Sequence, residues 1–132
     1  MSIIDDLKQE EGFRSHYYKD SRGFLTIGYG YNLDKGMSEK VASALLELMV
    51  EEKVIELKAA IPFWNTLSQE RKDVFVDMAY NMGTSGLLKF KNMLKAVEQG
   101  DIESVCNEMK NSAWYSQVGN RAVKLVEKYR KV

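Results

Sequence analysis

Apolar side chains at the start of the chain follow a helical spacing. Ile3 and Leu7 begin a row at intervals of four that continues to Glu11. Ser2 precedes this row and is a residue type that caps helix N-termini, and a glycine follows Glu11, where helices commonly end. The pattern predicts a first helix that ends at Glu11. Because Ile3 and Leu7 belong to the same row, we expect the Glu11 carboxylate to point towards protein.

The pattern changes between residues 15 and 33 to tyrosines, threonine, isoleucine and glycines. These are residues typical of short strands, and Asp-Ser-Arg-Gly between them is a turn sequence. The segment therefore predicts a β-hairpin followed by a short third strand. Asn-Leu-Asp-Lys-Gly closes it.

A long helix is expected next, from a cap at Ser38 to about Ala60, with Pro62 ending it. At 1.5 Å per residue it is roughly 30 Å long, which suits a helix that links two lobes. The rest of the chain is helical by its spacing and has no repeat. The expected helices run from Ser68 to about Met82, from Leu87 to Gln99 after a break at Gly83 and Gly86, from Asp101 to about Ser112, and from about Tyr115 or Asn120 to Lys128. One mostly helical α+β domain with a small sheet near its start fits this order.

The amino-acid composition excludes few classes of function. The chain has 132 residues, of which 45% are hydrophobic and 29% charged, as in ordinary globular enzymes and binding modules. Nineteen basic side chains balance nineteen acidic ones, so the net charge gives no attraction to nucleic acid or to anionic lipid. No apolar run reaches the roughly 20 residues that span a bilayer, and the first residues do not resemble a signal peptide. We therefore expect no nucleic-acid partner, no stable membrane insertion, and accumulation in the cytoplasm.

The single cysteine, Cys106, cannot form an internal disulfide, and no cysteine–histidine cluster supplies metal ligands. We interpret Cys106 as a small buried residue of a helix. The alternative is a nucleophile activated by His16, the only histidine.

Glu11 is the first candidate for chemistry. An ordinary surface glutamate at a helix end is the simpler interpretation. However, burial of its row and the negative end of the helix dipole would both disfavour the charged form, as a general acid requires.

Asp20 and Thr26 follow within the sheet segment. Aspartate at the first position of a turn is common for local hydrogen-bonding reasons, and threonine is common in strands. The functional alternative is that Asp20 stays ionised opposite Glu11, while Thr26 helps to hold a water molecule beside it.

Further candidates carry weaker signals. Gly30, inside Ile-Gly-Tyr-Gly-Tyr-Asn, marks either a bulge or a rim that a sugar approaches closely. Tyr31 can stack on a sugar ring or simply pack. Trp114 either fills a corner between helices or belongs to a polar–aromatic cluster in which Arg121 lies beside Glu10 or Glu11.

Several stretches together resemble the phage-type lysozymes, glycoside hydrolase family 24, over nearly the whole chain. The matching pieces are Asp-Asp-Leu-Lys-Gln-Glu-Glu-Gly-Phe-Arg, Tyr-Lys-Asp, Thr-Ile-Gly-Tyr-Gly, Asn-Met-Gly-Thr-Ser-Gly-Leu-Leu-Lys-Phe and Ser-Ala-Trp-Tyr-Ser-Gln-Val-Gly-Asn-Arg-Ala. The resemblance implies one lysozyme-like domain over residues 1–132. Its small β lobe would cover about 13–60, and its helical lobe about 61–132 plus the helix at 1–11, with a glycan cleft between them.

The resemblance also implies roles for single residues. Glu11 resembles the general acid, and Asp20 resembles the carboxylate that orients the attacking water together with Thr26. Arg121 matches the arginine that pairs with the acid.

The implied sugar contacts are Asn32 and Tyr80, with Asn81 bordering the same cleft. Tyr31 stands where many relatives carry histidine, so the histidine–aspartate pair of that family cannot form here.

The implied activity is hydrolysis of the β-1,4 bond between N-acetylmuramic acid and N-acetylglucosamine in peptidoglycan, with inversion and without metal or cofactor. The expected partner is a peptidoglycan glycan strand, and the protein is expected to be a monomer. It would accumulate in the host cytoplasm and act on the periplasmic wall after release. The alternatives are a lytic transglycosylase, or a non-catalytic helical domain that binds peptidoglycan or a protein partner.

Overall fold

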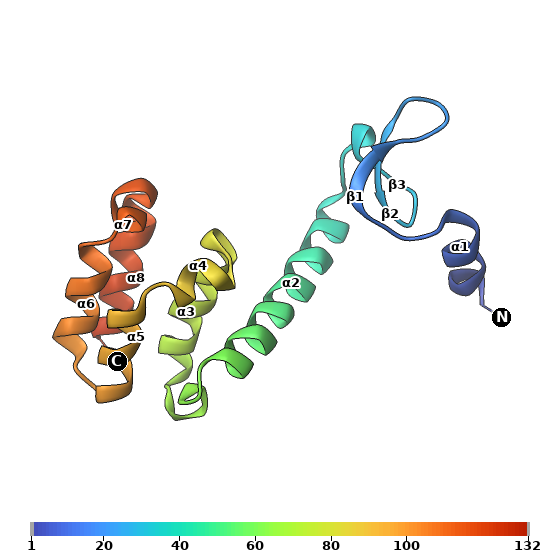
Figure 1. Cartoon of the computed structure of the whole chain (residues 1–132). Helices are drawn as coiled ribbons and strands as arrows, with labels where there is room; N and C mark the ends of the chain where they lie inside the picture. The colour runs from blue at the N-terminus through green and yellow to red at the C-terminus, as the bar shows by residue number, and fades with distance from the viewer. Residues whose placement is uncertain (1, 132) are drawn as a thin grey trace. The chain divides into compact units, whose positions relative to one another are not determined.

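The computed structural model describes residues 2–131 and divides into two compact units, residues 1–45 and 46–132. Their boundary falls inside α2 (Glu39–Ala60), the long helix of Figure 1. In this division the first helix belongs to the same unit as the sheet. The expected grouping of residues 1–11 with the helical lobe stays a prediction.

The first unit begins with α1 (Ile3–Glu11), as its spacing predicted. The Ser2 hydroxyl accepts a hydrogen bond from the Asp5 amide, and the Asp5 carboxylate accepts one from the Ser2 amide. This reciprocal cap satisfies amide groups that the first turn leaves without partners. The helix ends where the Gly12 amide donates to the Lys8 carbonyl.

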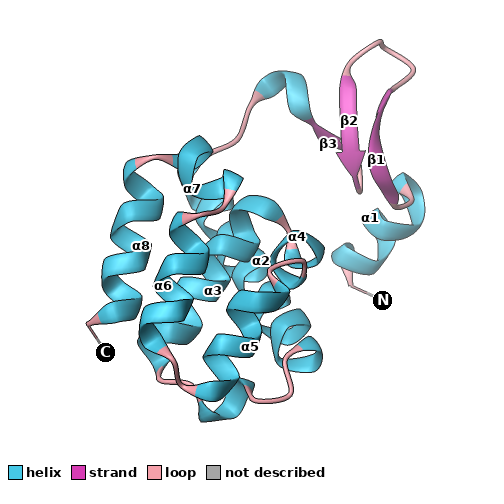
Figure 2. Cartoon of the chain, turned by 60° about the vertical axis from the view of Figure 1, so that its left-hand side comes forward, coloured by secondary structure: helices cyan, strands magenta, loops and turns pink. Residues whose placement is uncertain are grey.

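Three antiparallel strands follow in the order β1 (Arg14–Lys19), β2 (Leu25–Gly28) and β3 (Tyr31–Asn32). They lie side by side in Figure 2, with Thr26 on the central strand opposite Tyr18 on one side and Asn32 on the other. The predicted hairpin and third strand are therefore confirmed. A short 3-10 helix, η1 (Leu33–Lys35), leads to α2, whose first turn is capped by the Ser38 hydroxyl.

The second unit is helical and contains the core. After α2 and η2 (Trp64–Thr66), its elements are α3 (Gln69–Met82), α4 (Thr84–Leu88), α5 (Lys91–Gln99), α6 (Ile102–Lys110), α7 (Ala113–Val118) and α8 (Asn120–Arg130). Every buried apolar side chain among the described residues lies between positions 57 and 129. The largest fully buried ones are Phe75, Leu57, Ile61, Met78, Leu87, Met93 and Met109.

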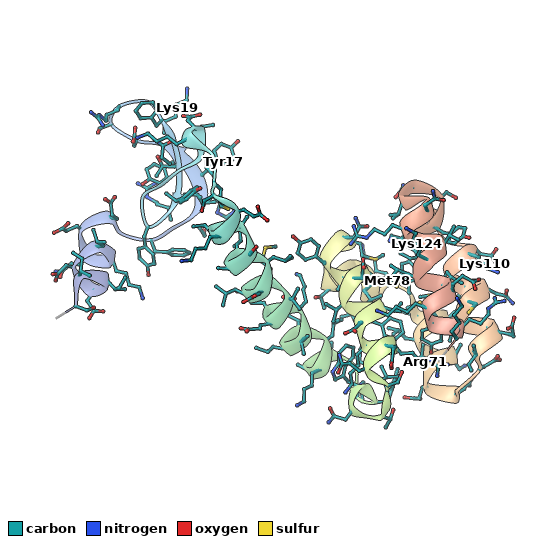
Figure 3. The ribbon with its side chains drawn as sticks, turned by 180° about the vertical axis from the view of Figure 1, so that it is seen from behind. Tyr17, Lys19, Arg71, Met78, Lys110 and Lys124 are labelled. Carbon is teal, nitrogen blue, oxygen red and sulfur yellow. The ribbon has the colours of Figure 1, made fainter. Side chains whose placement is uncertain are left out.

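Helices α3 and α8 are joined at the edge of this core by Arg71 and Tyr129. The Arg71 guanidinium lies 4.5 Å from the centre of the Tyr129 ring, and its Nε donates to the Tyr129 carbonyl at 3.3 Å. Arg71 and the buried Met78 are labelled on α3 in Figure 3. Cys106 on α6 is fully buried in the core, so its interpretation as a buried residue is confirmed.

One helix boundary was predicted wrongly. Gly83 does end α3, but Gly86 lies inside α4 instead of breaking the chain. The break comes at Phe90, whose ψ of 59° takes it out of the helix, so α5 begins at Lys91 and not at Leu87. A glycine weakens a helix without forbidding it, and Gly86 packs closely against Met82, where a Cβ would lie 3.2 Å from Cγ.

The observed architecture is thus α+β, with a small antiparallel sheet in the first unit and helices elsewhere. Over residues 2–131, no helix has the length and apolar character needed to cross a bilayer.

Candidate active site

Glu11 is the last residue of α1, and its side chain lies over the backbone of Gly30. A Cβ built on Gly30 would lie 3.2 Å from Cγ of Glu11, 2.6 Å from Cδ and closer still to Oε2. The carboxylate therefore occupies the space above a residue that has no side chain. The acid candidate is placed against the turn between β2 and β3.

The burial expected for the rest of the Glu11 row stays a prediction. Ile3 and Leu7 are 67% and 42% exposed, and Glu11 itself is exposed. The reason is that among the described residues of the first unit only Thr26 is buried, so α1 has no apolar core within that unit to pack against. The carboxylate faces the sheet turn instead.

Aromatic contacts hold the same turn against the end of α1. The ring of Tyr29 lies 5.6 Å from that of Phe13, and the Lys8 ammonium group lies 5.6 Å from the centre of the Tyr29 ring. Together with the Glu11–Gly30 contact, these interactions join the β2–β3 turn to the last turn of the helix.

Asp20 closes the turn between β1 and β2. Its Oδ1 accepts hydrogen bonds from the Arg22 and Phe24 amides, each at 2.9 Å, and its own amide donates to the Phe24 carbonyl. Asp20 therefore makes the local hydrogen bonds that are typical of an aspartate at the first position of a turn. None of the hydrogen bonds described for residues 2–131 reaches Oδ2, so one carboxylate oxygen remains available to a ligand.

Thr26 is 3% exposed, and its hydroxyl donates to the Phe24 carbonyl at 3.0 Å. A hydroxyl has one proton and two lone pairs. Because the proton is engaged, Thr26 can only accept from a further partner. Phe24 thereby connects the two candidates: its amide fixes Asp20 and its carbonyl orients Thr26.

Asn32 lies opposite Thr26 in the sheet. Its Oδ1 accepts from the Asp34 amide at 2.9 Å, which caps η1. The Tyr31 hydroxyl donates to the Gly36 carbonyl, so it closes the loop after β3. Sugar contacts for Asn32, Tyr31 and Gly30 stay predictions.

Asp34 is a residue that the sequence analysis missed. Its Oδ2 accepts from the Leu25 amide at 2.9 Å and ties η1 to the start of the strand that carries Thr26. The composition of Asn-Leu-Asp-Lys-Gly indicated a closing turn, but composition does not reveal a partner nine residues away.

The candidates of the second unit lie on three helices. Tyr80 and Asn81 are exposed near the end of α3, with Tyr80 41% exposed. Trp114 on α7 is buried, and its Nε1 has no hydrogen-bond partner among the described residues. The contacts of Tyr80 and Asn81 with a glycan stay predictions, as does the supporting role of Trp114 beside Arg121.

Arg121 on α8 binds Asp77 of α3. Its Nε and Nη2 donate to Asp77 Oδ1 at 2.8 and 2.5 Å, and Nη2 also approaches the Asp77 carbonyl at 3.4 Å. Sequence reasoning missed Asp77, since nothing in the spacing relates positions 44 residues apart. The predicted pairing of Arg121 with Glu10 or Glu11 concerns residues of the other unit and stays a prediction.

Between residues 2 and 131, no three His, Cys, Asp or Glu side chains are grouped so that they could hold a metal ion.

Comparison with known proteins decides the family. A model of the phage lysozyme family matches residues 8–131. The chain belongs to the phage lysozyme family. It is 30% identical to "Probable T4-type lysozyme 1" of Dictyostelium discoideum, over 95% of this chain and 91% of that protein. Membership of this family makes it a glycoside hydrolase.

Two other relatives are much longer than the chain itself. "Pre-baseplate central spike protein Gp5" of Enterobacteria phage T4 is 28% identical over 92% of this chain but only 26% of its own length. "Peptidoglycan hydrolase gp36" of Pseudomonas phage phiKMV is 24% identical over 93% of this chain and 14% of its own length. In both, the match covers one part of a larger protein.

Proposed function

We propose that this chain hydrolyses the β-1,4 bond between N-acetylmuramic acid and N-acetylglucosamine in peptidoglycan. The observation that carries the proposal is the Asp20–Phe24–Thr26 arrangement, which leaves a carboxylate oxygen and a hydroxyl lone pair as acceptors. Two acceptors suit a water molecule that must lose a proton as it attacks. Family membership and the printed names of the lysozyme and peptidoglycan hydrolase relatives support the choice of substrate.

In the proposed mechanism, Glu11 gives its proton to the leaving glycosidic oxygen. Water attacks the anomeric carbon from the opposite face, and its proton passes to Asp20 while Thr26 accepts a hydrogen bond from it. The anomeric configuration inverts. Such a reaction requires the two carboxyl groups to be about 6.5–9.5 Å apart, with room for the water molecule.

The proposal also assigns roles to other predicted residues. Arg121 would hold the acid, and Asn32, Tyr31, Tyr80 and Asn81 would contact the glycan. We propose that the enzyme acts as a monomer on the periplasmic wall after release from the cytoplasm, in host cell lysis. Its balanced charge of nineteen acidic and nineteen basic side chains supports a partner that is not nucleic acid.

The decisive experiment is Glu11→Gln in a turbidity assay on chloroform-treated Gram-negative cells. The amide cannot donate the required proton, so we expect clearance to fall by at least about 10²-fold. Glu98→Gln, the same change at an exposed position of α5, serves as the control and should clear cells like the wild type. If Glu11→Gln also clears them like the wild type, Glu11 is not the acid. If neither the wild type nor the variant clears cells, the chain is a binding domain.

A lytic transglycosylase is the alternative within enzymes. It uses one acid and lets a hydroxyl group of the sugar attack in place of water. Mass spectrometry of digested peptidoglycan separates the two, since hydrolysis gives reducing ends and transglycosylation gives anhydro-muramic ends. The predicted use of Asp20 and Thr26 favours reducing ends.

A further inference from the structure

The contact between Glu11 and Gly30 involves the end of the acid side chain. A Cβ at Gly30 would overlap the carboxyl carbon of Glu11 at 2.6 Å and press on Cγ at 3.2 Å. Real Cβ atoms essentially never approach other heavy atoms within 3.0 Å. Any side chain at position 30 therefore has to displace the carboxylate from where the structure places it.

Gly28, two residues earlier, shows that this property belongs to one glycine and not to the whole turn. Both glycines have positive φ, 67° for Gly28 and 75° for Gly30, and both favour glycine for that reason. A Cβ at Gly28 would meet nothing within 4 Å. The two positions share a positive φ and differ in their relation to Glu11.

Within residues 2–45, no hydrogen bond or ion pair of the structure fixes the Glu11 carboxylate. Its position in this unit depends on packing against the bare Cα of Gly30. Tyr29 holds that Cα in place through its contacts with Phe13 and Lys8.

We propose that Gly30 is a positioning residue for Glu11, and that its lack of a side chain, not a contact with sugar, is what the reaction requires. The catalytic part of this inference rests on the proposed function, because Glu11 is the acid only there. The contact itself does not depend on it.

The test compares Gly30→Ala with Gly28→Ala. Because the obstructed atoms are the end of a flexible side chain, Glu11 can rotate away at little energetic cost. The two variants should therefore lose similar thermal stability, roughly 4–8 °C in Tm, from the Cβ at positive φ. Their activities should differ. A misplaced acid lowers kcat, so on soluble peptidoglycan fragments Gly30→Ala should lose about 10²-fold more kcat than Gly28→Ala, with KM unchanged.

A structural readout tests the contact independently of activity. In the wild type, NMR should show a cross-peak between the γ protons of Glu11 and the α protons of Gly30. The cross-peak should persist in Gly28→Ala and weaken in Gly30→Ala.

Three outcomes would overturn the proposal: no such cross-peak in the wild type, equal losses of kcat in the two variants, or a rise in KM for Gly30→Ala with kcat retained. The last would show that Gly30 contacts the sugar directly. Failure of the proposed function looks different, since Glu11→Gln would then retain full activity while the cross-peak remained.

Discussion

At the residue scale, the direction of each hydrogen bond determines what Thr26 can do. The Thr26 hydroxyl donates its only proton in a hydrogen bond to the Phe24 carbonyl, so this buried group can only accept a hydrogen bond from any further partner. In the proposed mechanism, the attacking water molecule would donate one hydrogen bond to Thr26 and direct its other proton to Asp20. On that proposal, water and not a hydroxyl group of the substrate attacks the anomeric carbon.

This orientation makes a prediction about Thr26→Val. Valine has nearly the same shape but accepts no hydrogen bond, so we expect kcat on peptidoglycan to fall by at least about tenfold, the scale of one lost hydrogen bond to a polarised group. Thr26→Ser keeps the hydroxyl and should retain most of the activity. Equal losses in the two variants would show that the methyl group, and not the hydroxyl, is what the site needs.

At the element scale, one hydrogen bond connects the long helix to the short helix after α3. The Thr84 hydroxyl donates to Glu56 Oε2 at 2.7 Å, and this bond lowers the pKa of Glu56 below its usual value, with the nearby Lys53 adding to the effect. A lowered pKa in the folded state means that folding favours the ionised form. The resulting stabilisation is complete above the usual pKa of 4.5 and is lost as the pH falls through the lowered value.

Thr84→Val removes the donor, so its effect should depend on pH. We expect the Tm difference from the wild type to be larger at about pH 7 than at a pH below the lowered pKa, where Glu56 is protonated in both proteins. Thr84→Ser preserves the hydroxyl and should show little dependence of this kind. A Tm difference that is the same at both pH values would contradict the assignment. The Glu56 side chain is 42% exposed, so the whole effect should be small and should weaken with salt.

The elements also show what a sequence can and cannot predict. Ser2 and Ser38 were recognised as caps, and Ser68 as the start of a helix, because a cap acts on amides within its own first turn. Phe90 was missed as a helix break, because no rule of local propensity singles out a phenylalanine there.

The same distinction applies to the candidate site. Glu11, Asp20 and Thr26 were predicted from their local spacing and their resemblance to a family. The hydrogen bond from Leu25 to Asp34 and the ion pair of Arg121 with Asp77 depend on how distant segments fold back, so the sequence alone did not reveal them.

At the scale of the whole molecule, the two units differ in their means of stability. All buried apolar side chains that the structure describes lie in residues 57–129, whereas residues 2–45 bury only Thr26. Hydrophobic burial is the main favourable term in folding, and a chain of about 40 residues without a core, disulfide or metal seldom folds alone. Residues 1–45 are thus expected to depend on the rest of the chain.

The prediction is that a fragment of residues 39–132, which keeps α2 whole, folds by itself. Its circular dichroism should be helical, and it should melt cooperatively without cleaving peptidoglycan, because Glu11, Asp20 and Thr26 are absent. Phe75 is fully buried. Phe75→Ala in this fragment should cost about 3–5 kcal/mol, a large share of the roughly 5–15 kcal/mol typical of a domain, and should abolish or strongly lower the transition. A separate fragment of residues 1–45 should show no cooperative transition. If it melts cooperatively, or if the helical fragment does not, stability is distributed differently from the buried core.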